Sequence, residues 1–503
     1  MEDARRPTPD LRSETHALRR LGGKGDRCPL VNVAGVSEIG GGVERGFHRG
    51  PEDTYMTRQQ HLKERIRARM SKTGESYTAA RRRVLASRRD TDSSAPTYRL
   101  RGGIHPDTSA FANSLANARV VCNGKPLSEP LILGIGGGLG AGYILWQFTG
   151  HHPIVTLGFR NQWQYPDKWL IKTALRLGIE PKVHETSGHL TAMRSLRDAL
   201  ASSGPRPLVW IDAQEIGYWH LPERLSGHGG YPVVIYDEID GRFLIDDRNS
   251  AQLSVDEATL RAARGRVSSY RNRLVTFEAP DEIPDRVLAR AIEEGLKDHV
   301  SHLESDSDSF SLPAWRKWSR MLMDTRQKKG WANAFSDQAG LFGVLLSIYE
   351  SIESSGYGGG SLRGVYANFL EAAAELTSRP ALATVAGGYR DLDRQWAELA
   401  ERAAPNDPGL FTHARKLIDS LHEQVLDGGD RSEPAARRIA NELWRLRDTG
   451  DEVNVLDENA FIQLLESLGS AIQTLYEGEQ SVLSDLASAV NGTSITRSRR
   501  RSK

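Results

Sequence analysis

The spacing of apolar residues changes near residue 280. Before it, Val, Ile, Leu and aromatic residues gather in short runs typical of strands, at 130–135, 153–159, 207–213, 231–238, 241–247 and 272–278. Helical spacing occurs among the earlier runs, over 108–118, 166–178 and 189–203. After residue 280 apolar positions recur three or four apart, as in Leu464, Leu465 and Leu468. The pattern predicts a mixed α/β domain over 101–280 and an all-α domain over 281–490.

The ends of the chain lack this periodicity. Residues 1–54 are rich in Gly, Pro, Arg and acidic residues, so we expect them to be mostly disordered. Residues 55–100 predict a basic helical extension, with twelve Lys or Arg against four acids, a balance of +8. It could be an arm for nucleic acid or an acidic partner, or a solvated helical appendage. No aromatic residues interleave its charges as in base-stacking segments, so nucleic acid is the less favoured partner. Residues 491–503 predict a basic, disordered tail.

Composition narrows the class further. The 503 residues carry 66 Lys and Arg against 65 Asp and Glu, and only two cysteines, Cys28 and Cys122. These numbers disfavour a general nucleic-acid binder and a disulfide-based fold. The stretch 130–159 has no charged residue, but its glycines argue against a membrane span. With no apolar signal region at the start, we expect a cytoplasmic protein.

Two glycine clusters could approach a ligand. Gly136, Gly137 and Gly138 follow the run 130–135, but no acidic residue follows as far as Phe159, which disfavours a dinucleotide site. This cluster could border a bound acyl or carrier arm, or simply pack tightly.

The second glycine cluster precedes a helix. There Gly359 lies just before Arg363, which could hold an anion at the start of that helix or pair with Glu353.

Four stretches of the sequence resemble a known family. They are GGIHPDTSAFANSL (102–115), LSEPLILGIGGGLGAGY (127–143), YPVVIYDEIDGRFLIDDR (231–248) and YESIESSGYGGGSLRGVYANFLEAAAEL (349–376). The first three resemble the N-terminal domain of butirosin biosynthesis protein H. The fourth resembles the helical domain of unknown function that usually follows it. The basic 55–100 segment is similar to an N-terminal extension of various actinobacterial proteins.

The resemblance implies a papain-like fold and a place in secondary metabolism, such as antibiotic biosynthesis. It also implies an acyltransferase that moves an aminoacyl group from a carrier-protein thioester to an amine. A Cys nucleophile, a His base and an Asp or Asn that orients the His would perform this chemistry. The partners would be an acyl carrier protein and a small amine, a homo-oligomer is an open alternative, and we expect no metal or cofactor.

This sequence departs from the family pattern at two of the three catalytic positions. Aligning His105 with the family's His puts Pro106 where the Cys belongs. Tyr231 stands where the catalytic His is usual, with His228 three residues before it. Two acidic candidates remain at the end of the hairpin, Asp246 and Asp247.

Hydroxyl groups could replace the missing thiol. Thr108 and Ser109 lie at the expected start of a helix, where backbone N–H groups stabilise a developing anion. Such residues are also common helix caps, and Asp107 is the favoured N-cap. Cys122 lies beyond this helix and is expected to be a buried apolar residue. Trp219 is expected to line an apolar pocket or the core.

Two hypotheses therefore remain open. The chain is either an acyltransferase with an altered nucleophile, or a pseudoenzyme that binds an acylated carrier, a peptide or a small amine. Residues expected to contact substrate in either case are Gly136, Gly137, Gly138, Trp219, Tyr231, Gly359 and Arg363.

Overall fold

The structure is a computed structural model that describes residues 98–147, 152–353, 355, 358–405, 409–453 and 456–492. All of these belong to one compact unit, Ile66–Lys503. The predictions made for residues 1–97 and for the tail 493–503 lie outside the described residues.

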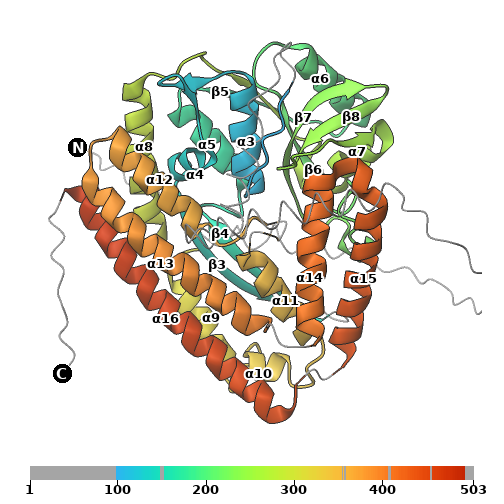
Figure 1. The fold of residues 1–503 in the computed structure, drawn as a ribbon, viewed down its shortest axis with the longest axis vertical. Helices are drawn as coiled ribbons and strands as arrows, with labels where there is room; N and C mark the ends of the chain where they lie inside the picture. The colour runs from blue at the N-terminus through green and yellow to red at the C-terminus, as the bar shows by residue number, and fades with distance from the viewer. Residues whose placement is uncertain are drawn as a thin grey trace, which may run out of the picture. The chain divides into compact units, whose positions relative to one another are not determined.

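The first part is mixed α/β, as the apolar pattern predicts, and its main sheet has six antiparallel strands in the order β5-β10-β6-β7-β8-β9 (Figure 1). The helix α3 packs against β7, α7 against β6, and α6 against β10. The helices are α3 (Pro106–Asn117), α4 (Glu129–Ile135), α5 (Pro166–Arg176), α6 (His189–Ala201) and α7 (Glu257–Arg266). The sheet strands are β5 (Glu180–His184), β6 (Leu208–Asp212), β7 (Gly230–Ile239), β8 (Arg242–Asp246), β9 (Leu253–Asp256) and β10 (Leu274–Glu278). A minor pair is formed by β1 (Val121–Cys122) and β2 (Lys125–Pro126), and Cys122 is buried.

The predicted hairpin is present, with Asp240 and Gly241 at its turn. Both have positive φ, 52° and 75°, which is the geometry that an Asp-Gly pair favours in a two-residue hairpin. This turn sets the register of β7 and β8, and thereby places Tyr231 at the start of one strand and Asp246 at the end of the next.

The prediction of a strand over 130–135 is wrong, because this run forms the helix α4. Ser128 caps it by accepting from the backbone N–H of Leu131, and Pro130 lies in its first turn. A short apolar run has no periodicity to separate a buried strand from a buried helix, so the local caps decide.

The strand that does follow is β3 (Leu139–Trp146), which pairs antiparallel with β4 (Ile154–Arg160). This ribbon leaves the main sheet and packs among the helices of the second part, β3 against α8 and α9 and β4 against α11. Tyr143 of β3 stacks on Trp318 of α9 with ring centroids 5.6 Å apart, and accepts a hydrogen bond from Trp331 Nε1 at 2.9 Å. The two parts of the chain therefore share one core.

The second part is helical, as predicted. Its helices are α8 (Asp285–Leu303), α9 (Pro313–Met323), α10 (Trp331–Ala334), α11 (Leu341–Ile352), α12 (Arg363–Leu376), α13 (Pro380–Ala403), α14 (Leu410–Glu423), α15 (Glu433–Glu452) and α16 (Glu458–Asn491). Between α14 and α15 the chain forms a π-turn at Gln424–Gly428 and a 3₁₀ turn at Gly429–Ser432. Asp430 of this connection accepts from the backbone N–H of Ser254 at 2.9 Å, which fastens the helical part to β9.

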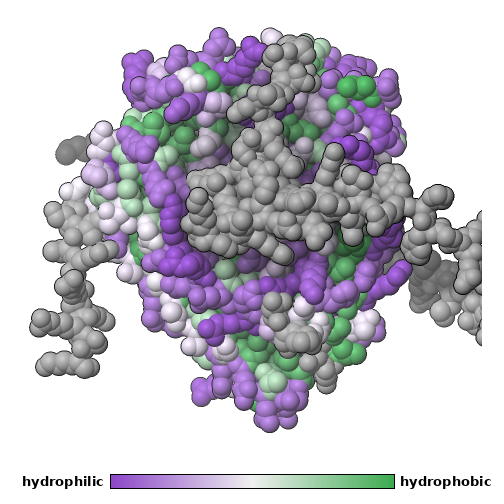
Figure 2. Space-filling model, in the orientation of Figure 1, coloured by the Kyte–Doolittle hydropathy of each residue, from purple (hydrophilic) through white to green (hydrophobic). Residues whose placement is uncertain are grey.

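In the part of the chain that the structure describes, no helix is both long and apolar enough to cross a membrane. The face drawn in Figure 2 is largely hydrophilic, with apolar areas in separate patches.

Candidate functional site

The N-terminus of α3 is built around a buried ion pair. His105 is the N-cap residue and Pro106 occupies the first turn. Asp107 does not cap the helix, contrary to prediction, because its carboxylate accepts from Arg160, from Nε at 2.9 Å and from a terminal nitrogen at 2.7 Å. Arg160 ends strand β4, so this bond ties the helix to the ribbon.

Glu129, at the first turn of α4, holds the chain that leads into α3. Its carboxylate accepts from the backbone N–H of His105 at 2.8 Å and from that of Ile104 at 3.1 Å. The hydroxyl of Thr108 donates to the same Oε1 at 3.0 Å. One carboxylate thus satisfies donors that the helix itself leaves without partners.

Ser109 is held in a different way. Its hydroxyl donates to the carbonyl oxygen of His105 at 2.6 Å, one turn back along the helix. The exposed fraction of both Ser109 and Thr108 is 1%. No hydrogen bond joins either hydroxyl to an imidazole nitrogen within the described ranges.

The imidazole of His105 is neutral at physiological pH. Burial lowers the pKa of His105 to about 3, the charges of Arg160 and Arg248 lower it further, and Asp107 only partly opposes them. The distance from its Nε2 to the Asp107 carboxylate is 4.0 Å, and its Nδ1 is buried without a hydrogen-bond partner among the residues described.

Tyr231 and Asp247 form the second cluster, at the far end of the hairpin. The Tyr231 hydroxyl donates to the Asp247 carboxylate at 2.7 Å and accepts from Trp219 Nε1 at 2.7 Å. Tyr218 donates to the same carboxylate at 2.9 Å, and Arg248 Nε at 3.0 Å. Burial and the Asp247 charge raise the pKa of both tyrosines well above the usual value, so both remain protonated donors.

Asp246 points to the other side of the hairpin. It accepts from the Tyr98 hydroxyl at 2.8 Å and from the Asn113 amide at 3.2 Å. Burial, aided by the neighbouring Asp247, raises the pKa of Asp246 to about 7, and the Tyr98 and Asn113 hydrogen bonds only partly oppose this rise. Asp246 and Asp247 therefore serve different contacts although they are adjacent in sequence.

The two clusters meet at Arg248 and at a turn from the helical part. An Arg248 terminal nitrogen donates to the carbonyl oxygen of Ile104 at 3.4 Å, which joins the hairpin to the segment before α3. Gly359 covers His105, since a Cβ at Gly359 would lie 2.6 Å from the His105 Cα. Of the predicted site residues, the structure thus brings His105, Thr108, Ser109, Tyr231, Trp219, Asp247 and Gly359 into one region.

Other predicted residues lie elsewhere or act as packing groups. His228 is exposed in the loop before β7, and the described contacts do not bring its side chain to His105. Gly137 and Gly138 have positive φ and face side chains at less than 3 Å from a would-be Cβ, among them His299 and Asn161. Gly136 likewise abuts the Trp169 indole. These glycines pack tightly against protein atoms, which was the second of the two alternatives given for this cluster.

Arg363 is fully buried and pairs with Glu479 of α16 at 2.7 Å, so the alternative pairing with Glu353 is wrong. Its guanidinium also lies 5.2 Å from the ring centroids of Phe159 and Trp396. The pair connects α12 to α16 and the ribbon, with the charge of Arg363 matched by a carboxylate.

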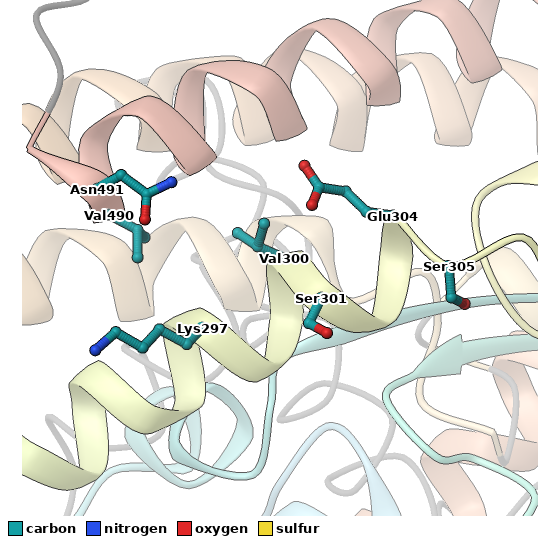
Figure 3. A pocket seen from close by; sticks show the side chains of 7 residues that line it. All are labelled: Lys297, Val300, Ser301, Glu304, Ser305, Val490 and Asn491. Carbon is teal, nitrogen blue, oxygen red and sulfur yellow. The ribbon is translucent and has the colours of Figure 1, made fainter. Parts of the chain in front are cut away.

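Two hollows near the described residues can be compared with the site. One lies between the loop before β7 and the helices α11, α14 and α15, and has Trp219 in its wall. The other is a groove of about 230 Å³ between α8 and the end of α16, where Lys297 and Asn491 lie at one end and Glu304 and Ser305 at the other (Figure 3). Only the first contains a residue of the site. The described residues contain no group of three or more His, Cys, Asp or Glu placed to hold a metal ion.

Sequence reasoning missed three residues that shape this site, Glu129, Arg160 and Arg248. Glu129 and Arg248 lie within stretches that carry the family resemblance, and that was the available signal. Arg160 had none, because its partner Asp107 is 53 residues away in sequence.

The protein is of the α+β class. Its mixed α/β part, with an antiparallel sheet, shares one core with a helical part. Residues 105–248 match the family model described as butirosin biosynthesis protein H, N-terminal, and residues 257–424 match a domain of unknown function, DUF4872. The chain therefore contains a domain of the butirosin biosynthesis protein H, N-terminal, family followed by a DUF4872 domain, in the order expected from the sequence. No curated protein matches the chain.

Proposed function

We propose that this chain is a non-catalytic member of its family, which binds an acyl-bearing ligand of secondary metabolism, such as an acylated carrier. The observation that carries the proposal is the state of the two substitute nucleophiles. Both hydroxyls are buried and each donates to a fixed acceptor, Ser109 to a carbonyl oxygen and Thr108 to Glu129.

The remaining family positions support the same conclusion. A nucleophile needs a base within hydrogen-bond reach, and the base must be able to take a proton. Pro106 supplies no nucleophile, and Tyr231 is a donor to Asp247 that burial keeps protonated. At these two positions the chain therefore has neither the nucleophile nor the base that the family resemblance implies.

One contact favours a second candidate function, acyl transfer through Thr108. In that reaction the Thr108 oxygen would attack the thioester carbonyl, Glu129 would take its proton, and the carrier thiolate would leave. An amine would then attack the Thr108 ester, releasing the amide product and restoring the hydroxyl. Against this, the same Glu129 oxygen already accepts from the His105 backbone, and Thr108 is 1% exposed.

Intact-mass measurement separates the two functions. The protein is incubated with an acyl carrier protein loaded with phenylacetyl or aminoacyl thioester, with and without an amine acceptor. We expect no mass increase on the chain and no amide product, together with saturable binding of the loaded carrier. An adduct on the wild type that Thr108→Ala or Ser109→Ala abolishes would refute the non-catalytic function.

A further inference from the structure

The segment that leads into α3 lies against the candidate site as a strap. The strap is residues 98–103, which belong to no helix or strand. Its last residue covers Ser109, because a Cβ at Gly103 would lie 2.3 Å from the Ser109 Cβ and 3.1 Å from the Arg248 Cγ. With the strap in this position Ser109 is buried. The strap is therefore part of the cover over the start of α3.

Side chains of α3 hold the strap by its backbone. Asn117 accepts from the backbone N–H of Arg99 at 2.7 Å and donates to the Arg99 carbonyl oxygen at 3.1 Å. Asn113 donates to the carbonyl oxygen of Gly102 at 3.1 Å. Near the surface, water can replace such bonds at a small net cost. We therefore expect the strap to open locally while the core stays folded.

Tyr98 fastens the beginning of the strap. Its ring stacks on Tyr236 of β7, with the ring centroids 4.4 Å apart and 10° between the ring planes. Its hydroxyl donates to a carboxyl oxygen of Asp246 at 2.8 Å. Asp246 is fully buried, so the side chain in contact with it also helps to keep water away.

The closed strap makes a charge on Asp246 unfavourable. Burial raises the pKa of Asp246 to about 7, Asp247 adds to the rise, and the bonds from Tyr98 and Asn113 only partly oppose it. An aspartate in water has a pKa of about 3.9, so opening the strap releases a proton to the solvent at any pH between these values.

The cations near Asp246 do not offset this effect. Arg248 pairs with Asp247, and Arg101 lies on the exposed part of the strap itself. The polar groups that face Asp246 from the elements around it are Tyr98 and Arg101 of the strap, Asn113 of α3, Tyr236 of β7, and Asp247 and Arg248 after β8.

We propose that residues 98–103 act as a pH-controlled strap, which opens away from α3 and uncovers Ser109 when Asp246 loses its proton. Opening admits water to Asp246 and so lowers the cost of its charge. As the pH falls from 7 towards 4, the closed form holds a proton that the open form releases, so the strap closes more firmly. The inference does not depend on the proposed function, because it concerns access to the site and not the ligand or the reaction there.

Hydrogen–deuterium exchange of the full chain, followed by mass spectrometry, measures the opening. Peptides that cover 98–104 are compared from pH 5 to pH 8 after correction for the intrinsic pH dependence of exchange, and peptides from the middle of α16 report global unfolding. We expect the strap to exchange faster than α16 at every pH, and its opening equilibrium to rise at least tenfold between pH 5 and pH 8. A strap as well protected as α16, or an opening equilibrium that does not change with pH, would overturn the proposal.

Variants test the contact that controls the strap. Asp246→Asn cannot ionise and should remove the pH dependence of opening, while Asp281→Asn, at an exposed aspartate, should keep it. Tyr98→Phe keeps the ring on Tyr236 but removes the hydroxyl, and should raise the opening equilibrium several-fold at each pH. If Asp246→Asn does not fold, Tyr98→Phe still decides the matter, since unchanged opening there contradicts the role of this hydrogen bond.

Alkylation shows whether opening uncovers position 109. Ser109→Cys is treated with iodoacetamide at one pH, with and without Tyr98→Phe, and the labelled residue is located by peptide mass. Because the pH is the same, the ratio of the two labelling rates reports access and not thiol chemistry. We expect several-fold faster labelling with Tyr98→Phe, and equal rates would contradict the covering of Ser109 by the strap.

The outcomes for the two proposals are separate. An acyl adduct seen by intact mass would refute the non-catalytic function and leave the strap as it is. Exchange at 98–104 that is independent of pH would refute the strap and leave the non-catalytic function as it is.

Discussion

Replacing Asp246 with asparagine should remove the loss of stability that Asp246 causes as the pH rises. Asp246 has no exposed surface, and its pKa is raised from 3.8 to about 7. Between these two pH values the folded protein holds a proton that the unfolded chain releases. The contribution of Asp246 to the free energy of unfolding is therefore full below pH 4 and is lost as the pH rises towards 7. The linkage relation gives a loss of about 2–3 kcal/mol between pH 5 and pH 8.

The asparagine variant cannot ionise, so it lacks this loss. Its amide oxygen still accepts from Tyr98, but its NH₂ group faces the donor of Asn113, which costs about 1 kcal/mol at any pH. We therefore expect Asp246→Asn to be about 1 kcal/mol less stable than the wild type at pH 5 and about 1–2 kcal/mol more stable than the wild type at pH 8.

Urea unfolding of both proteins from pH 5 to pH 8 measures the difference directly. Asp281→Asn, at an exposed aspartate, is the control for a general change of net charge. If the stabilities of the wild type and Asp246→Asn run parallel across this range, the carboxyl is not held protonated by burial and the reasoning fails.

Three further outcomes follow from the packing. Gly359→Ala should lower the free energy of unfolding in urea by at least about 2 kcal/mol, because φ is 85° and the new Cβ would lie 2.6 Å from the His105 Cα. The control Gly358→Ala, with nothing within 4 Å of its new Cβ, should change stability by less than about 0.5 kcal/mol. Equal effects of the two substitutions would contradict the packing of Gly359 over His105. The wild type should lose about 2 kcal/mol as the pH falls from 6.5 to 5, because the folded pKa of His105 is about 3, and His105→Gln should remove this part of the pH dependence. Arg363→Met should cost about 3–5 kcal/mol by thermal or urea unfolding because it strands buried Glu479, and adding Glu479→Met should restore much of that loss; a double variant as unstable as the single one would argue against a buried ion pair.

How far the sequence predicts this structure depends on how local each signal is. The hairpin turn at Asp240 and Gly241 and the periodic helices were predictable because neighbouring residues determine them. The run 130–135 was not, since a capping serine outside it selects the helix. The roles of Asp107 and Arg363 were also not predictable. The partner of Asp107, Arg160, lies 53 residues away in sequence, and the partner of Arg363, Glu479, lies 116 residues away.

The candidate site shows the same division. Alignment of short motifs was enough to identify His105, Tyr231 and Asp247 as positions of the candidate site, and the structure places them in one region. The role of the Thr108 hydroxyl was not predictable, because it depends on Glu129, which lies 21 residues away and resembles an ordinary acidic residue in the first turn of a helix.

The ribbon of β3 and β4 has a consequence for anyone who wants to work with one half of the molecule. Tyr143 and Phe159 complete the aromatic packing around Trp315, Trp318 and Trp396, although they belong to the other family segment. A truncated product ending after residue 256 would present these rings to water, and the remaining helices would lack their centre. Neither half is a suitable unit for separate expression or for grafting onto another scaffold.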